Sequence, residues 1–183
     1  MHATLSDSLL DLIQNAHEAG AHSIIVTIKQ RSSHMEFSIA DDGCGMESEV
    51  LARISDPFSS DSAKHASRRF GLGLPFLKQG IEQCAGTFDI RSEPGVGTSI
   101  CFALDSNHID APPVGNLVST IVSALCMCDS AELVCVRSYE NRSYTLRRSE
   151  LVEVLGDLAT TESLCAIRTF ISNAEENLSS GET

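Results

Sequence analysis

Basic residues are scarce in this chain. Its 183 residues include 13 lysines and arginines against 25 aspartates and glutamates, which gives a formal net charge of -12 at pH 7. A surface of this sign repels nucleic-acid backbones and anionic membranes, so neither is expected as the main partner. A single nucleotide is not excluded, because one pocket can be locally positive within an acidic protein.

Long apolar segments are also missing. The longest one runs from Leu117 to Cys128, is broken by serine and threonine, and is too short to cross a bilayer. The N-terminus lacks the basic segment followed by an apolar run that marks a signal peptide. We therefore expect a cytoplasmic protein. Hydrophobic residues still make up 42% of the chain, enough for a folded core.

A disulfide framework is absent as well. The 7 cysteines are odd in number and scattered, unlike the pattern of small secreted proteins, so reduced thiols are expected. Cys126 and Cys128 form the one close pair. They fall in a predicted helix, where residues two apart do not face each other. We expect this pair to be packed structurally rather than to bind a metal or undergo redox chemistry.

The periodicity of the apolar residues indicates an α+β fold. Leucines and isoleucines recur at helical spacing in the first helix, while the strands alternate apolar and polar residues or carry β-branched runs. Helices are predicted at residues 4–19, 47–54, 71–84, about 115–128, 149–156 and 162–177, and strands at 23–30, 35–39, 87–92, 98–104, about 132–138 and 143–147. We expect one domain at residues 1–105, a linker at 106–113 and a small α+β region at 114–183.

The first segment with chemical potential lies in the opening helix. Asp11 and Asn15 are four residues apart, so they share one side of the helix, away from the apolar stripe. A carboxylate and an amide so placed can hold a water molecule and a magnesium ion, which needs few protein ligands. Taken alone, the pair fits a solvated helix face better.

The second segment directly follows a predicted strand. Asp41 ends this strand, and Gly43 and Gly45 let the backbone approach a flat or charged ligand. A carboxylate in this place can accept a hydrogen bond from an adenine amino group. A tight turn rich in aspartate and glycine is the alternative.

The third segment is Gly71-Leu72-Gly73-Leu74 at the predicted start of a helix. Unpaired backbone amides and the helix dipole at such a position favour phosphate. Lys64, Arg68 and Arg69 precede it and would neutralise phosphate charge, although solvent exposure explains each of them singly.

The fourth segment, residues 95–98, joins two predicted strands. It suits a plain hairpin turn, or a turn that places the Thr98 hydroxyl near Asp41 and completes a base pocket.

Together with Asp56-Pro57-Phe58, these segments, in this order, resemble the ATPase domain of sensor histidine kinases. Their superfamily also includes type II topoisomerases, a heat-shock chaperone and the MutL mismatch-repair ATPases. The resemblance covers about residues 5–104. Residues 71–104 look most like the sensor-kinase branch, and residues 15–21 are also similar to the mismatch-repair branch.

The resemblance implies a two-layer α/β sandwich with a mixed, mainly antiparallel sheet, and a site for ATP and Mg²⁺. It assigns the magnesium to Asn15, the adenine amino group to Asp41 with help from water and Thr98, and a lid to residues 59–69. The implied nucleotide-binding set is Asn15, Asp41, Gly43, Gly45, Lys64, Gly71, Leu72, Gly73, Leu74 and Thr98.

The implied catalytic residue is Asp11, which stands where members that hydrolyse ATP often have glutamate. Aspartate is one methylene shorter, and a base must reach its water within hydrogen-bond distance. We therefore expect an ATP-binding regulatory protein that either phosphorylates a protein partner or hydrolyses ATP slowly as a switch. The alternatives are an ATP-sensing module without turnover and a MutL-like clamp that dimerises with ATP, so a homodimer is possible.

Two departures from the family pattern shape these expectations. Sensor kinases carry a helical hairpin with a phosphoacceptor histidine upstream of the ATPase domain, and this chain begins almost at the Asn15 helix. His17-Glu18 lies inside that helix, so self-phosphorylation is not expected. Residues 106–183 match nothing in the family.

Overall fold

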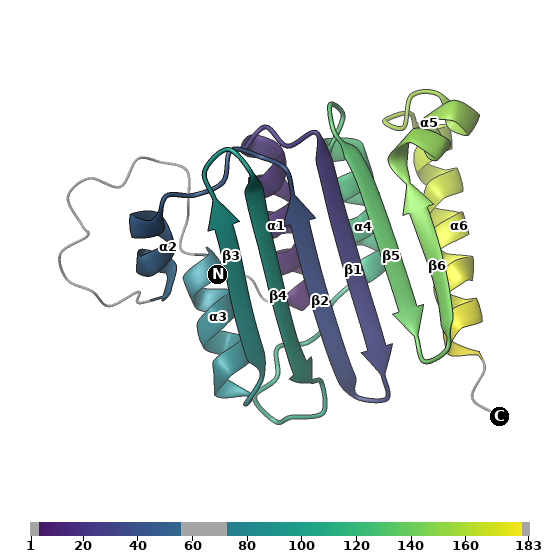
Figure 1. Ribbon diagram of the computed structural model, residues 1–183. Coiled ribbons are helices and arrows are strands. Elements are labelled where there is room, and N and C mark those ends of the chain that lie inside the picture. Colours follow the sequence, from purple (N-terminus) through teal and green to yellow (C-terminus); the bar gives the residue numbers. More distant parts are fainter. Residues whose placement is uncertain (1–3, 56–72, 181–183) are drawn as a thin grey trace.

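In the described part of the chain six strands form one sheet, and the longer helices lie against one of its faces (Figure 1). The computed structural model describes residues 4–55 and 73–180. The predicted lid and the segment Asp56-Pro57-Phe58 lie outside the described residues. In chain order the elements are α1 (Leu5–Glu18), β1 (Ser23–Arg31), β2 (His34–Asp41), α2 (Ser48–Ser55), α3 (Gly73–Gln83), β3 (Thr87–Glu93), β4 (Gly97–Asp105), α4 (Leu117–Met127), β5 (Glu132–Tyr139), β6 (Arg142–Arg147), α5 (Arg148–Leu155) and α6 (Thr161–Ser179).

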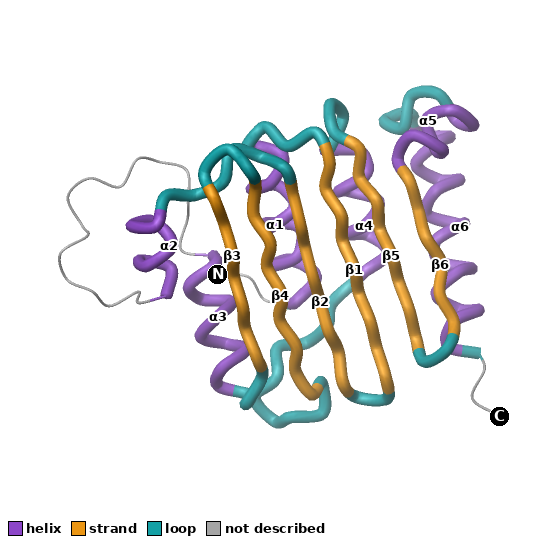
Figure 2. Tube along the Cα trace, viewed as in Figure 1, coloured by secondary structure: helices purple, strands orange, loops and turns teal. Residues whose placement is uncertain are grey.

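The strand order in the sheet is β3-β4-β2-β1-β5-β6. All neighbours pair antiparallel except β1 and β5, which run parallel. The parallel pair needs a long crossover, and the chain between β1 and β5 includes α4, which packs behind the sheet (Figure 2). This arrangement confirms the expected α+β sandwich with a mixed, mainly antiparallel sheet.

One face of the sheet is apolar, because the strands alternate. Phe37 of β2 and Phe102 of β4 are register partners, and their rings stack with centroids 4.9 Å apart. The neighbouring inward positions of the central strands are also buried: Ile24, Val26, Ile28, Met35, Ile39, Ile100 and Leu104. Burial of this many large side chains against the helices supplies the main driving force for folding.

Helix α1 covers the middle of this apolar face. Its N-terminus is fixed by a capping box, in which Thr4 Oγ1 accepts from the Asp7 backbone N–H at 3.1 Å and Asp7 Oδ2 accepts from the Thr4 N–H at 3.1 Å. Leu5, Leu9 and Leu12 are buried along one stripe. The helix is followed by Gly20, whose φ of 75° turns the chain toward β1.

The C-terminal part of the chain extends the same sheet. Strand β5 pairs with β1 along its whole length, from Ser23 opposite Glu132 to Gln30 opposite Tyr139. Helix α4 packs on α1, and α6 packs on β5 and β6. The chain just before α4 is bonded to the start of α1, where the Leu5 N–H donates to the Pro113 carbonyl at 2.9 Å. The domain limits predicted at residues 105 and 114 stay a prediction, although the sheet itself runs across them.

All seven cysteines lie in the described part of the chain and carry free thiols. Cys126 lies in the last turn of α4, and Cys128 is the C-cap residue of this helix. Burial raises the pKa of Cys128 to about 11 and that of Cys135 to about 12, which keeps both protonated and unreactive at neutral pH. Of the helices in residues 4–55 and 73–180, none has the length and apolarity that a membrane span requires.

Candidate functional site

The loop after β2 is held between two other elements. The Cys44 N–H donates to the Ala19 carbonyl at the end of α1 at 3.0 Å, and the Gly95 N–H in the β3–β4 turn donates to the Cys44 carbonyl at 2.8 Å. Because both bonds come from the backbone, the loop position does not depend on the Cys44 side chain. The loop therefore links the end of α1 to the β3–β4 turn.

Glycine is required at two places in this junction. Gly45 has a φ of 64°, and a methyl group on it would overlap the Glu93 carbonyl. Gly97 has a φ of 132°, and a methyl group on it would overlap the Asp41 carbonyl. Only a residue without a Cβ permits these backbones to approach so closely. The close approach brings the ends of β2 and β4 together at one side of the sheet.

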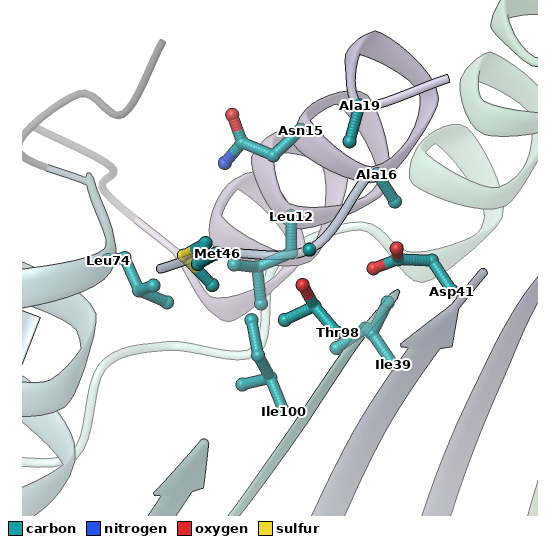
Figure 3. Close-up of a pocket in the computed structure, with 11 residues that line it drawn as sticks. Leu12, Asn15, Ala16, Ala19, Ile39, Asp41, Met46, Leu74, Thr98 and Ile100 are labelled. Atoms are coloured by element: carbon teal, nitrogen blue, oxygen red, sulfur yellow. The ribbon is translucent and has the colours of Figure 1, made fainter. Parts of the chain in front are cut away.

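A small pocket opens at this junction, with a cavity volume of about 30 Å³. Figure 3 shows its lining residues, drawn from α1, β2, the loop after β2, α3 and β4. Its lining consists of Leu12, Asn15, Ala16, Ala19, Ile39, Asp41, Gly45, Met46, Leu74, Thr98 and Ile100. Apolar side chains make up most of the walls, and three polar side chains converge on them, which is the usual character of a small-molecule site.

Asp41 is the one ionisable side chain among the described lining residues. Its Oδ1 accepts from the Gly43 N–H at 2.9 Å. Burial raises the pKa of Asp41 above its ordinary value of 3.8, the Gly43 and Thr98 backbone N–H groups oppose this rise, and the Asp42 charge adds to it. A half-buried carboxylate that is poorly solvated gains from a ligand that donates a hydrogen bond to it.

The neighbouring aspartate has a different role. Asp42 Oδ1 turns toward the start of β1, where it accepts from the His22 N–H at 2.7 Å and the Ser23 N–H at 2.8 Å. The Ser23 bond is the main reason that the pKa of Asp42 is lowered from 3.8. Asp42 therefore stabilises a turn, while Asp41 faces the pocket.

Thr98 is positioned by a serine that the motif did not identify. The Ser92 and Thr98 hydroxyl oxygens lie 2.8 Å apart. Ser92 also accepts from the Met46 N–H at 2.8 Å and donates to the Gly97 carbonyl at 3.1 Å. Ser92 could have been found from the expected hairpin, because a turn at residues 93–97 places Ser92 opposite Thr98 in the strand pair.

The structure brings five of the predicted site residues around this pocket: Asn15, Asp41, Gly45, Leu74 and Thr98. Gly43 lies in the loop after β2 and is buried against Ala19, outside the pocket lining. Gly73 begins α3 and lines a separate groove together with Thr4 and Phe76. Asp11 is one turn before Asn15 on α1 and is not among the described lining residues. Lys64, Gly71 and Leu72 lie outside the described residues, and the roles given to all these residues stay predictions.

The apolar walls of the pocket were not among the site residues predicted from the sequence. They include Leu12 and Ala16 of α1 and Ile39 of β2. Their periodicity did indicate burial, but a stripe of apolar residues does not tell which of them borders a cavity. Met46 and Ile100 belong to the same group.

Comparison with known proteins identifies the family. Residues 3–108, more than half of the chain, match the sequence profile of the histidine kinase-, DNA gyrase B- and HSP90-like ATPases. The chain belongs to this ATPase family. The match includes all the described pocket residues and ends shortly after β4.

The curated relatives of this ATPase domain include sensor kinases. The chain is 35% identical over 106 residues to the sensor histidine kinase ZraS of Klebsiella oxytoca, which covers 56% of this chain and 22% of that protein. It is 34% identical over 96 residues to sporulation kinase C of Bacillus subtilis, which covers 51% of this chain and 22% of that protein. The chain thus matches about a fifth of the length of these relatives.

Solved structures resemble the fold of this family member over a longer stretch. The N-terminal domain of a DNA repair protein has a TM-score of 0.59 and 11% identity, and the match covers 86% of this chain and 58% of that one. The Aquifex aeolicus MutL ATPase domain complexed with ADP has a TM-score of 0.56 and 13% identity, and covers 86% of this chain and 69% of that one. The shared fold therefore reaches beyond the residues of the family profile.

Proposed function

We propose that this chain binds ATP with Mg²⁺ in the pocket at the ends of β2 and β4 and acts in a signalling system as an ATP-dependent regulatory protein. The observation that carries the proposal is Asp41, a poorly solvated carboxylate among apolar walls. A flat purine matches the walls, and its exocyclic amino group is a further donor to this carboxylate, beside the Gly43 and Thr98 N–H groups. A guanine carbonyl in the same place would meet a second acceptor and be rejected.

In this proposal different residues around the pocket bind the base, the metal ion and the phosphates of ATP. ATP supplies the phosphoryl group for transfer, and Mg²⁺ neutralises its charge. Asp41 accepts from the adenine amino group, and Thr98 supports the base beside it. The Asn15 amide oxygen on α1 is the protein ligand of the magnesium, and the amides at the start of α3 face the phosphates.

Asn15 gives a direct test of the metal assignment. Titration calorimetry of the full chain with ATP should show tighter binding in magnesium than in EDTA. In Asn15→Ala the affinity in magnesium should fall toward the value in EDTA, while Gln14→Ala, on the exposed side of the same helix, should behave like the unsubstituted chain. Equal magnesium dependence in Asn15→Ala would remove Asn15 from the metal site.

A protein phosphotransferase or a slow ATPase uses the same pocket, and Asp11 separates the two. If Asp11 is the base for hydrolysis, Asp11→Ala should abolish phosphate release without changing ATP affinity, and Asp11→Glu, with its longer reach, should increase the rate. Unchanged, very slow release in both variants would assign the chain to phosphotransfer onto a partner or to ATP sensing without turnover. The position of Asp11 outside the described pocket lining favours the sensing module as the second candidate.

Dimerisation is the third property to measure. Sedimentation of the chain with and without ATP distinguishes a monomeric regulatory protein from a clamp that closes as a dimer. We propose that the regulatory role requires a protein partner rather than DNA, because the net charge of -12 opposes a phosphate backbone.

A further inference from the structure

The free edge of the sheet at β6 has an unusual charge for this protein. Strand β6 is last in the strand order, and no other described strand pairs with its outer edge. Its two terminal residues, Arg142 and Arg147, are exposed, and it contains no acidic residue, although the whole chain has a net charge of -12. An unpaired edge presents backbone N–H and C=O groups that can accept another strand.

The opposite edge of the sheet lacks this feature. Strand β3 carries Asp89 and Arg91, and their side chains form an ion pair with Arg91 Nε 3.0 Å from Asp89 Oδ2. Glu93 is a second acidic residue of that strand, so its net charge is negative. The two edge strands differ, because β6 contains two arginines and no acidic residue of its own.

The arginines of β6 are held weakly. Arg147 Nε lies 3.7 Å from Glu150 Oε1, and both side chains are more than half exposed, at 51% and 69%. Arg142 donates to the Asn177 carbonyl at 2.7 Å and makes no acidic contact there. The exposed Arg147–Glu150 pair contributes little free energy, so an incoming carboxylate can compete for the Arg147 guanidinium group.

An apolar groove of about 410 Å³ lies beside the same strand, between β6, α5 and α6. Two of its lining side chains are unusually exposed for apolar residues, since Val154 is 80% and Phe170 is 56% accessible. Leu146, Leu151 and Ile167 form the deeper part of the groove. In Figure 1 the two helices flank β6 at the end of the sheet, with α5 next to the end of the strand and α6 behind it.

We propose that the β6 edge and this groove bind an extended acidic segment of a partner protein, which adds a strand to the sheet. Successive side chains of a strand point to opposite faces. One set would enter the groove and bury apolar groups beside Phe170, and acidic residues of the other set would meet Arg147. Backbone pairing then supplies affinity, while the groove and Arg147 supply selectivity.

This interaction surface is independent of the proposed nucleotide site. Strands β1 and β5 separate β6 from β2 and β4, whose ends form the pocket. The groove also lies outside residues 3–108, which match the ATPase family. The surface would select a partner whether or not nucleotide is bound.

The test uses the full chain and fluorescent ten-residue peptides in which glutamate alternates with valine, isoleucine, leucine or phenylalanine, and a matched panel with lysine in place of glutamate. A chain with a net charge of -12 attracts the lysine peptides by long-range electrostatics. The proposal predicts the reverse preference, with at least about tenfold tighter binding of glutamate peptides. Equal binding of both panels, a preference for lysine, or no saturable binding of glutamate peptides would overturn it.

Variants locate the binding surface. Arg147→Glu and Phe170→Ala should each weaken the best glutamate peptide by at least about fivefold. Arg91→Glu on the β3 edge and Ile109→Ala, an apolar residue that is 95% exposed elsewhere, should bind it normally. Equal losses in the control variants, or none in the β6 and groove variants, would place the site elsewhere.

Amide exchange distinguishes strand addition from other occupants. A bound strand should slow exchange of residues 142–147, because their outer N–H groups become paired. Protection confined to α5 and α6 would indicate a helix in the groove. Sedimentation showing a dimer that is lost in Phe170→Asp would assign the surface to a second copy. Either result would overturn the proposal.

Discussion

Asp41 and Thr98 are direct partners in the antiparallel pairing of β2 with β4. Both side chains line the pocket, and in Figure 3 the carboxylate and the hydroxyl point into the same space. Their relative position is set by the backbone register and by Gly97, which lies against the Asp41 carbonyl. Substitutions of these side chains therefore test the chemistry of the pocket with little effect on its frame.

Asp41→Asn should weaken ATP binding by at least about tenfold, because a charged acceptor in a partly buried contact contributes about 1.5–3 kcal/mol. Titration calorimetry at neutral pH measures the change. Asp42→Asn is the matched control, since the Asp42 carboxylate faces His22 and Ser23 rather than the pocket, and it should retain the affinity. Equal affinity in the Asp41 variant would refute its role in binding the base.

The same two aspartates should affect stability in opposite directions. The pKa of Asp41 is raised, so its ionised form destabilises the fold above that pKa, and this penalty vanishes as the pH falls to 3.8. The pKa of Asp42 is lowered, so its contribution stabilises the fold above 3.8 and is lost as the pH falls through its folded value. At neutral pH, without nucleotide, Asp41→Asn should be more stable than the unsubstituted chain and Asp42→Asn less stable.

Urea unfolding at a series of pH values checks this pair. The difference in unfolding free energy between each variant and the unsubstituted chain should shrink in acid. For Asp41→Asn it should shrink above pH 3.8, and for Asp42→Asn below pH 3.8. Shifts of the same sign in both variants at neutral pH would contradict the assignment.

Gly97→Ala should damage both stability and ATP binding. The new methyl group would overlap the Asp41 carbonyl, and the φ of 132° disfavours any side chain, so the loss should exceed about 1 kcal/mol. Gly95→Ala in the same turn is the control. Its φ is 76°, but a methyl group there meets no atom within 4 Å, so it should cost about 1 kcal/mol and leave ATP affinity unchanged. Thermal unfolding and calorimetry of the two variants would show the contrast.

Glu175→Gln should destabilise the C-terminal part of the sheet. Glu175 Oε2 accepts from Arg137 Nε at 3.3 Å, and the Arg137 side chain is only 4% exposed. The glutamine retains an acceptor for the Tyr144 hydroxyl, which lies 2.6 Å from Oε1, but leaves the arginine charge uncompensated. We expect a loss of about 1.5–3 kcal/mol in urea unfolding.

Glu176→Gln provides the control for that charge, because this neighbour on α6 is exposed. Its unfolding free energy should change by less than about 0.5 kcal/mol. A Glu175→Gln effect as small as this would mean that the buried pair does not stabilise the attachment of α6.

Much of the fold was predictable, because each element has a local signal. The leucine stripe of residues 5–16 indicated α1, and the alternation of Met35, Phe37 and Ile39 indicated β2. The predicted helices and strands all occur within a few residues of their expected ends. The C-terminal hairpin was predicted too, but its parallel pairing with β1 was not, because no local pattern records which strand a new strand will join.

The sequence by itself determined the family, because its motifs occur in the family's order. The local pattern around each motif also predicted that Asn15 lies on a helix, Asp41 at the end of a strand and Thr98 next to a turn. Only the tertiary structure decided which of two adjacent aspartates faces the pocket. Asp41 and Asp42 are chemically identical, and their different surroundings, a cavity wall for one and the N–H groups of His22 and Ser23 for the other, arise from contacts between distant segments. The same holds for the positive edge at β6, because a strand becomes an edge only when the order of the whole sheet is fixed.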